Sequence, residues 1–328
     1  MKKMLVTILC CISILACSGC QTEQVVTDNG IGTTCGNITM GSGDFAYGND
    51  FIYIAAYTEI YEYDIQSGKT VVLSVNDGSI AGSVYLSQDE IFYCEDFGGI
   101  GLYCMSKDGK KTNTVFTVEA DTEADTTTAD SITKLFPDGE GVYYMNGVEG
   151  TLFYRDLNTK IETPLISGVN TYFADETMLY VIAKENDQWQ LLQSSKGTIA
   201  FSNILLSFEP IAVFAAGEDI YAAQKGTYQI TRYANGEETL LPVCSTFFQV
   251  VGDQLLYSDS EEYEGGCFPL KSYDLHTGEI QLLCNNVYDF CLLEDRYVCC
   301  SCRSEVGQYY MLLDLNENTQ TQMYPEVA

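Results

Sequence analysis

Acidic residues at a recurring position are the side chains of this chain best placed for chemistry. Each precedes a short apolar run and lies in the predicted turn between a first and a second β-strand: Asp50, Glu90, Asp175, Asp219, Asp253 and Asp295. Two carboxylates at a suitable separation could hydrolyse a glycosidic bond, one as acid and one as base or nucleophile. Asp is also a common turn residue, because its side chain accepts hydrogen bonds from nearby backbone N–H groups. We therefore interpret each acid as a turn residue and keep the carboxylate pair as the alternative.

Histidine chemistry is limited to one residue. His276 is the only histidine of the chain and lies in DLHTGE, a predicted turn at the rim of the fold. A Ser-His-Asp or Cys-His site would have to be built on it. The chain contains no P-loop, no GxGxxG after a strand and no GxSxG elbow. We therefore predict no catalytic residue, no cofactor and no cofactor-binding residue.

Cysteine is abundant, with 14 residues, and in an exported protein the usual state is the disulfide. A reducing habitat would instead allow free thiols that pack as small apolar side chains. Cys94 and Cys104 lie on the two strands of one predicted hairpin and could form a disulfide if the register places them opposite each other. The CCSC run at 299–302 lacks the CxxC spacing of zinc sites, so we predict no metal site.

The N-terminus has the pattern of an export signal. Two lysines precede an apolar run, at residues 4–16, that is too short to span a bilayer. The sequence ILAC resembles a bacterial lipobox, which predicts a signal peptide at 1–16 and lipid attachment at Cys17. Cys20 is the alternative site, and secretion without a lipid is the other possibility. Residues 17–37 then form the lipid anchor and a flexible tether, which predicts a cell-membrane location on the extracytoplasmic face, with the N-terminal lipid as the only membrane contact.

Charge limits the partners. The formal net charge is −30, and removal of Lys2 and Lys3 with the signal peptide makes it more negative by two. Such a surface repels nucleic acid and anionic lipid headgroups, so nucleic-acid binding is excluded. The acidic, threonine-rich stretch at 119–130 is typical of a solvated loop.

A repeat of β-strands organises residues 38–328. A polar or glycine turn followed by an apolar run recurs seven times, at intervals averaging about 41 residues, as expected for a four-stranded propeller blade. The runs are centred on Tyr53, Tyr93, Tyr144, Tyr180, Tyr221, Tyr257 and Cys299. We predict an all-β, seven-bladed β-propeller of four-stranded antiparallel blades.

A second element of the repeat follows each run. Stretches such as EYDIQSGK, FYRDLNTK and SYDLHTGE place an Asp and an aliphatic residue at the end of a third strand, before a polar turn. Asn or Gly in that turn supplies the left-handed conformation that a tight hairpin into the fourth strand needs. The first and last blades are each complete in contiguous sequence, so we expect the ring to close by side-to-side packing, without strand exchange.

This pattern of an aromatic strand followed by an LYRxDLxTG-like segment resembles the propeller lipoproteins of clostridia and related gut bacteria, within the YWTD-like and TolB-like class. The resemblance covers about 290 residues. It implies the fold and leaves the activity open, because propellers have many functions. YWTD rings have six blades, and the YWTD tetrapeptide is absent here. We expect a non-catalytic binding or scaffolding module for an unknown protein or glycan at a propeller face; the alternative is a surface hydrolase or lyase acting on carbohydrate.

Overall fold

The computed structural model describes residues 44–56, 59–74, 81–86, 90–95, 100–118, 132–138, 141–146, 150–174, 178–198 and 200–324. Within these ranges the chain is almost entirely β, with one short 3-10 turn, η2 (Ser260–Glu262). The predicted signal peptide, Cys17, Cys20 and the tether lie outside the described residues, as does the acidic stretch at 119–130.

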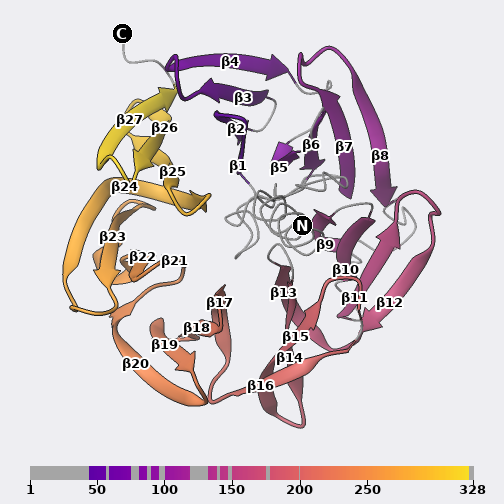
Figure 1. Ribbon diagram of the computed structural model, residues 1–328, viewed down its shortest axis with the longest axis vertical. Helices are drawn as coiled ribbons and strands as arrows, with labels where there is room; N and C mark the ends of the chain where they lie inside the picture. Colours follow the sequence, from indigo (N-terminus) through magenta and orange to yellow (C-terminus); the bar gives the residue numbers. More distant parts are fainter. Residues whose placement is uncertain are drawn as a thin grey trace, which may run out of the picture.

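Antiparallel strands form sheets that follow one another around a central axis in sequence order (Figure 1). The first three sheets comprise β1 (Phe45–Gly48), β2 (Phe51–Ala56), β3 (Glu59–Asp64), β4 (Lys69–Ser74); β5 (Ala81–Leu86), β6 (Glu90–Glu95), β7 (Ile100–Ser106), β8 (Thr112–Val118); β9 (Ile132–Asp138), β10 (Gly141–Asn146), β11 (Thr151–Asp156) and β12 (Glu162–Ile166). The next two comprise β13 (Val169–Ala174), β14 (Met178–Glu185), β15 (Gln188–Ser195), β16 (Ser202–Leu206); β17 (Pro210–Ala216), β18 (Asp219–Gln224), β19 (Gln229–Ala234) and β20 (Glu237–Cys244).

The last sheet has seven strands and contains two four-stranded units that share one strand. It comprises β21 (Phe248–Val251), β22 (Gln254–Ser258), β23 (Phe268–Asp274), β24 (Ile280–Leu293), β25 (Tyr297–Ser304), β26 (Gly307–Asp314) and β27 (Thr319–Tyr324). β24 pairs first with β23 and then with β25, and Asn286 between the two parts has a φ of 58°. The all-β propeller with four-stranded antiparallel sheets is confirmed. The number of blades stays a prediction. Strand pairing among the described residues gives six sheets, and seven four-stranded units result only if β24 is divided between two of them.

The recurring apolar runs form the second strands. Their central residues lie in β2, β6, β10, β14, β18, β22 and β25, and all seven are buried. Both faces of a sheet are covered by its neighbours, so the apolar side chains form clusters between sheets, around the ring, instead of one central core. Burial on both faces explains why the second strands are apolar at successive positions.

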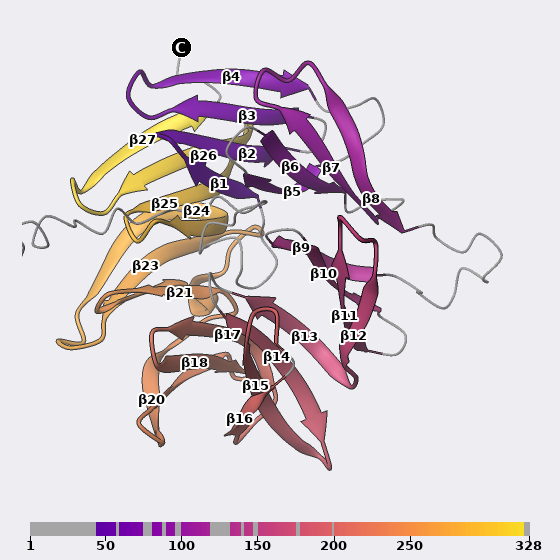
Figure 2. The ribbon, with the colours of Figure 1, turned by 45° about the vertical axis from the view of Figure 1, so that its right-hand side comes forward.

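The ring closes between the first and last sheets. Phe45 of β1 packs edge-on against Tyr310 of β26, with ring centroids 6.1 Å apart, inside an apolar cluster that draws on both sheets. The hydroxyl of Thr70 in β4 donates to the carbonyl oxygen of Met323 in β27 at 2.6 Å. β4 and β27 lie side by side in Figures 1 and 2. Among the described residues, the two sheets share no strand.

The Asp-aliphatic pattern at the ends of third strands is a turn motif. The Oδ1 atom of each Asp accepts hydrogen bonds from the backbone N–H groups two and three residues later, in Asp64, Asp156, Asp274 and Asp314. The residue four positions after each Asp has a positive φ: Gly68, Lys160, Gly278 and Asn318. The carboxylate therefore satisfies backbone donors that the turn would leave unpaired.

Candidate functional site

The third strand β19 departs from this turn motif. At its end, where β3, β11, β23 and β26 have Asp, stands Ala234, in the sequence TRYANGE; β7 and β15 also lack this Asp and end in Ser106 and Ser195. Across the hairpin, the residue at the start of β18 is Asp219, next to Ile220, which pairs with Tyr233. An acid at this position also occurs in other units, for example Asp50 and Glu90, so Asp219 is distinguished by its partner and not by its position. An Asp that is not an acceptor of the turn motif is a better candidate for function than one that is.

Asp219 instead forms an ion pair with Arg232 of β19. The Nε and Nη2 atoms of Arg232 donate to the Oδ2 atom of Asp219 at 2.8 and 2.5 Å. The Asp219 side chain is 23% exposed and that of Arg232 is 38% exposed, so both are accessible at the surface. Charge-assisted hydrogen bonds to one oxygen fix the orientation of the guanidinium plane, and the remaining N–H groups stay available to a ligand.

A polar cleft adjoins this ion pair. Its volume is about 250 Å³, and it lies between the β17–β20 sheet and the β21–β24 unit. The polar and ionisable side chains that line it are Asp219, Tyr221, Arg232, Asp253 and His276, with Ala216, Val250, Gly252 and Leu275 completing the wall. Asp253 comes from the β21–β22 turn, and His276 from the turn after β23. The two hairpin turns are fixed to each other, because the backbone N–H of Leu275 donates to the carbonyl of Asp253 at 2.8 Å.

The electrostatics of the cleft favour a neutral phenol beside a fixed cation. Burial raises the pKa of Tyr221; the charge of Arg232 opposes this shift, and those of Asp219 and Asp253 add to it. The hydrogen bond to Asp219 raises the pKa of Arg232, with smaller contributions that include the charge of Asp253. The cleft thus offers hydrogen-bond donors and acceptors side by side. Near neutral pH the phenol of Tyr221 stays neutral and the guanidinium of Arg232 stays positively charged.

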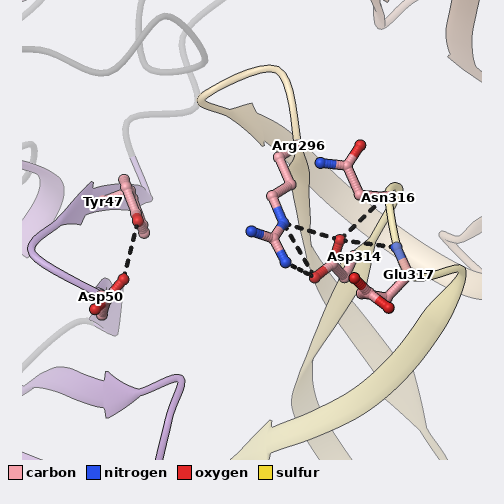
Figure 3. Close-up of polar contacts among 6 residues, drawn as sticks. All are labelled: Tyr47, Asp50, Arg296, Asp314, Asn316 and Glu317. Carbon is pink, nitrogen blue, oxygen red and sulfur yellow. Dashed lines mark hydrogen bonds and ion pairs between the residues drawn. The ribbon is translucent and has the colours of Figure 1, made fainter.

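A second arginine pair lies at the same end of the strands, in the last unit (Figure 3). Nε of Arg296 lies 3.1 Å from each carboxylate oxygen of Asp314, and Nη2 lies 2.7 Å from Oδ2. Asp314 also accepts the backbone N–H groups of Asn316 and Glu317 at 3.0 and 3.3 Å. The Arg296 guanidinium stacks at 4.8 Å on the ring of Tyr297. Asp314 is thus held both by its turn and by Arg296, which is a structural role, and neither residue lines the cleft.

Of the predicted carboxylates that lie in the described residues, Asp219 and Asp253 line one cleft. Asp50 accepts hydrogen bonds from the Tyr47 hydroxyl at 3.5 Å, shown in Figure 3, and from Gln66 at 2.7 Å. Glu90 begins β6, Asp295 lies in the β24–β25 turn, and Asp175 is outside the described residues. His276 is an exposed turn residue, as expected, and it also lines the cleft. Arg232 was not among the predicted residues, because no repeat pattern marks it and only the structure shows its ion pair with Asp219.

The register does not place Cys94 opposite Cys104. Cys94 pairs with Leu102 and Cys104 pairs with Phe92, so the two cysteines are diagonal neighbours across β6 and β7. Both side chains are buried. The hydrophobic pattern predicts the strands, but the register also depends on the connection between them, and residues 96–99 lie outside the described residues.

The described ranges contain no group of three or more His, Cys, Asp or Glu side chains arranged to hold a metal ion. No helix in the described part of the chain has the length and apolarity needed to cross a membrane. The SDSEEYEGG loop at 258–266 is ordered by Lys271, whose Nζ lies 2.7 Å from Asp259 and 3.0 Å from Glu262. Its acids are therefore partly neutralised by a cation of the neighbouring strand.

Comparison with known proteins supports the fold and leaves the family open. No family model matches this chain, and no curated protein sequence matches it. A puromycin-hydrolyzing peptidase of Mycobacterium tuberculosis has a similar structure, with 11% identity, a TM-score of 0.60, and coverage of 91% of this chain and 57% of that chain. The acylaminoacyl peptidase of Pyrococcus horikoshii matches with 11% identity and a TM-score of 0.58, over 88% of this chain and 52% of that chain.

TolB from Acinetobacter baumannii matches with 16% identity over 85% of this chain and 77% of that chain. Its TM-score of 0.48 is too low to support an argument. The chain spans about half of the length of the two peptidases. At such low identity these likenesses concern the fold alone, which fits a binding or scaffolding module but does not assign one.

Proposed function

We propose that this protein is a lipid-anchored, extracytoplasmic β-propeller that binds a hydroxyl-rich saccharide without catalysing its conversion. The observation that carries the proposal is the polar cleft between two neighbouring blades, where Arg232, Asp219, Asp253 and His276 present donors and acceptors together. Sugar hydroxyl groups both donate and accept hydrogen bonds, so they match such a mixture of side chains.

Charge favours a neutral saccharide over other ligands. A net charge of −30 repels polyanions, and two carboxylates line the cleft. A small cation would be repelled by the positive charge of Arg232, which its ion pair with Asp219 keeps beside the cleft. A neutral polyol avoids both costs and can use the free N–H groups of the guanidinium.

Binding without turnover is favoured over the carboxylate-pair alternative. Glycoside hydrolysis needs one carboxylic acid that gives a proton to the leaving oxygen. The Oδ2 atom of Asp219 already accepts two hydrogen bonds from Arg232, so this oxygen is engaged by the ion pair and is not available to the leaving oxygen. The alternative remains the hydrolase in which Asp253 supplies the acid. The similar peptidases do not lead us to propose peptide hydrolysis, because the likeness is one of fold.

The lipid anchor predicted at Cys17 would place the protein at the extracytoplasmic face of the membrane. We expect the mass of the protein extracted from membranes to correspond to a chain that begins at Cys17 and carries a diacylglycerol. The Cys17→Ser variant should keep its signal peptide, because the lipid-dependent cleavage needs the thiol. Normal processing of Cys17→Ser would move the site to Cys20, and an unmodified secreted chain would contradict the anchor.

The cleft is tested by titrating the purified protein with a panel of neutral oligosaccharides in a calorimeter. We expect Arg232→Gln to weaken the binding of any recognised saccharide at least about tenfold, because a hydrogen bond to a charged group contributes about 1.5–3 kcal/mol. Lys225→Gln is the matched control: it removes one positive charge from an exposed ion pair with Glu209 that lies outside the cleft.

Equal loss in both variants would mean that net charge, not the cleft, controls binding. Absence of binding across the panel would contradict the saccharide proposal and favour a protein partner at another face. Release of shorter saccharides by the wild-type protein, abolished by Asp253→Asn, would establish the hydrolase.

A further inference from the structure

Five of the six cysteines of the last two units separate into two apolar clusters, and the sixth, the buried Cys267, belongs to neither. Cys291 and Cys299 belong to the cluster that closes the ring against the first sheet. Cys284, Cys300 and Cys302 belong to a different cluster, between the β21–β24 unit and the strands β25–β26. The alternation of side chains along β25 explains the separation, because Cys299 points to one face of the sheet and the other two to the opposite face.

Two sulfur atoms of the second cluster are in contact. The Sγ atoms of Cys284 and Cys302 lie 4.0 Å apart, although the two residues belong to different parts of the sheet. Cys284 lies in the part of β24 that pairs with β23, opposite Leu270. Cys302 lies on β25, opposite Val287. The irregular segment of β24 between these parts brings the two thiols together.

We propose that Cys284 and Cys302 form a disulfide bond that joins the two units sharing β24. The bond needs a shortening of the sulfur–sulfur distance from 4.0 Å to the roughly 2.05 Å of a disulfide. Rotation of the side chains about their Cα–Cβ bonds moves sulfur atoms over such a distance. The pair therefore differs from Cys94 and Cys104, whose register is diagonal.

The chemistry is thiol–disulfide exchange with a small disulfide such as oxidised glutathione. The Cys284 thiolate attacks one sulfur of the oxidant, forms a mixed disulfide and releases one thiol. The Cys302 sulfur, after losing its proton to solvent, attacks the Cys284 sulfur and releases the second thiol. Two protein thiols thus lose two protons and two electrons, and the oxidant is reduced to two thiols.

The environments of the two thiols fit this order. Cys284 is 9% exposed and Cys302 is fully buried, so the oxidant meets Cys284 first. Hydrogen bonds from Cys300 and Cys302 lower the pKa of Cys284, which favours the thiolate that starts the exchange. The hydrogen bond to Cys284, together with burial, raises the pKa of Cys302.

The bond would cross-link the two units that share β24. It would close the chain segment from 284 to 302, which includes the Asn285–Asn286 irregularity and the β24–β25 turn. A cross-link that closes such a loop restricts the unfolded chain and raises the melting temperature. The inference does not rest on the saccharide cleft or on the lipid anchor, since the test supplies the oxidant.

The test equilibrates the purified full-length processed protein in a glutathione redox buffer, blocks remaining thiols under denaturing conditions and digests with trypsin. We expect a cross-link between the peptides 272–296 and 297–303, with fragment masses that place it on Cys284 and Cys302. Cys300→Ala and Cys299→Ala should keep the cross-link, and Cys302→Ala should lose it. The melting temperature of the wild-type protein should fall by about 5 °C on reduction, and that of Cys302→Ala should not respond.

Three results would overturn the assignment. One is the absence of this cross-link at equilibrium in the oxidising buffer. Another is a wild-type cross-link on Cys291 and Cys299, which face each other directly across β24 and β25. The third is a protein whose thiols hold a metal ion as purified and stay reduced until a chelator is added. The wild-type fragment masses decide between these outcomes even if a variant fails to fold.

Discussion

At the scale of single residues, this chain uses the same side chain for two purposes. Asp at the end of a third strand accepts backbone N–H groups and is consumed by its turn, as in Asp274. Asp at the start of a second strand is not held in this way, and Asp219 binds Arg232. The first kind is predictable from the spacing DLxTG. The second became recognisable only when the structure showed the ion pair between Asp219 and Arg232.

The turn aspartates make stability depend on pH. The hydrogen bonds from Arg296 are the main cause of the lowered pKa of Asp314, with the backbone N–H groups of Glu317 and Asn316 adding to it. A carboxyl whose folded-state pKa is lowered binds its proton more readily in the unfolded chain. Its contribution to stability is therefore present above the unfolded pKa of about 3.9 and is lost as the pH falls through the folded value.

We expect Asp314→Asn to lower the free energy of unfolding by about 1 kcal/mol at pH 7 and by progressively less as the pH falls below about 3.9. Urea denaturation at a series of pH values measures the difference. Asp295→Asn is the control, since Asp295 is an exposed turn residue in the same unit and Asn tolerates its φ of 50°. A difference between wild type and Asp314→Asn that is independent of pH would contradict this account.

At the scale of elements, the second strands were predictable and the registers were not. The second strands are buried on both faces, so residues such as Tyr180 and Tyr257 stand in runs of successive apolar residues. Such runs can be recognised in a sequence. Register depends on turn geometry, which is why Cys94 and Cys104 could be placed on one hairpin but not opposite each other. The continuity of β24 was also hidden, because Asn285-Asn286 has the composition of a turn.

Glycine positions allow a test of how neighbouring sheets are joined. Gly150 has a φ of 56°, and a Cβ atom there would lie 2.7 Å from the carbonyl oxygen of Val169, the first residue of the next sheet. The same two residues are bonded, because the N–H of Val169 donates to the carbonyl of Gly150 at 2.7 Å. We expect Gly150→Ala to lower the free energy of unfolding by about 2–3 kcal/mol, the sum of backbone strain and the displaced contact.

Gly236→Ala separates the two causes. Gly236 also has a positive φ, of 78°, but a Cβ atom there would meet no atom within 4 Å. Its replacement should cost only the backbone term, about 1 kcal/mol. Chemical denaturation of both variants gives the comparison, and equal losses would mean that the contact between the third and fourth sheets does not matter.

At the scale of the whole molecule, closure depends on packing between complete sheets. The cluster around Phe45, Tyr310 and Met323 joins the first and last sheets without a shared strand in the described residues. The contiguity of the first and last repeats predicted this arrangement. The repeat pattern could not predict which pair of neighbouring sheets has a cleft between them, because a cleft depends on the side chains of both sheets. Asp219 and Asp253 are 34 positions apart in the sequence, and the packing of neighbouring sheets brings them to the same cleft.

The central claim is that the cleft binds a saccharide and leaves it unchanged. The most direct test is mass spectrometry of a saccharide recognised in the titrations, after prolonged incubation with a stoichiometric amount of wild-type protein. We predict that the saccharide is recovered at its original mass, while Arg232→Gln no longer retains it on the protein. Recovery of cleaved or unsaturated fragments, in an amount that falls when Asp253 is changed to Asn, would contradict the claim and assign the cleft to catalysis.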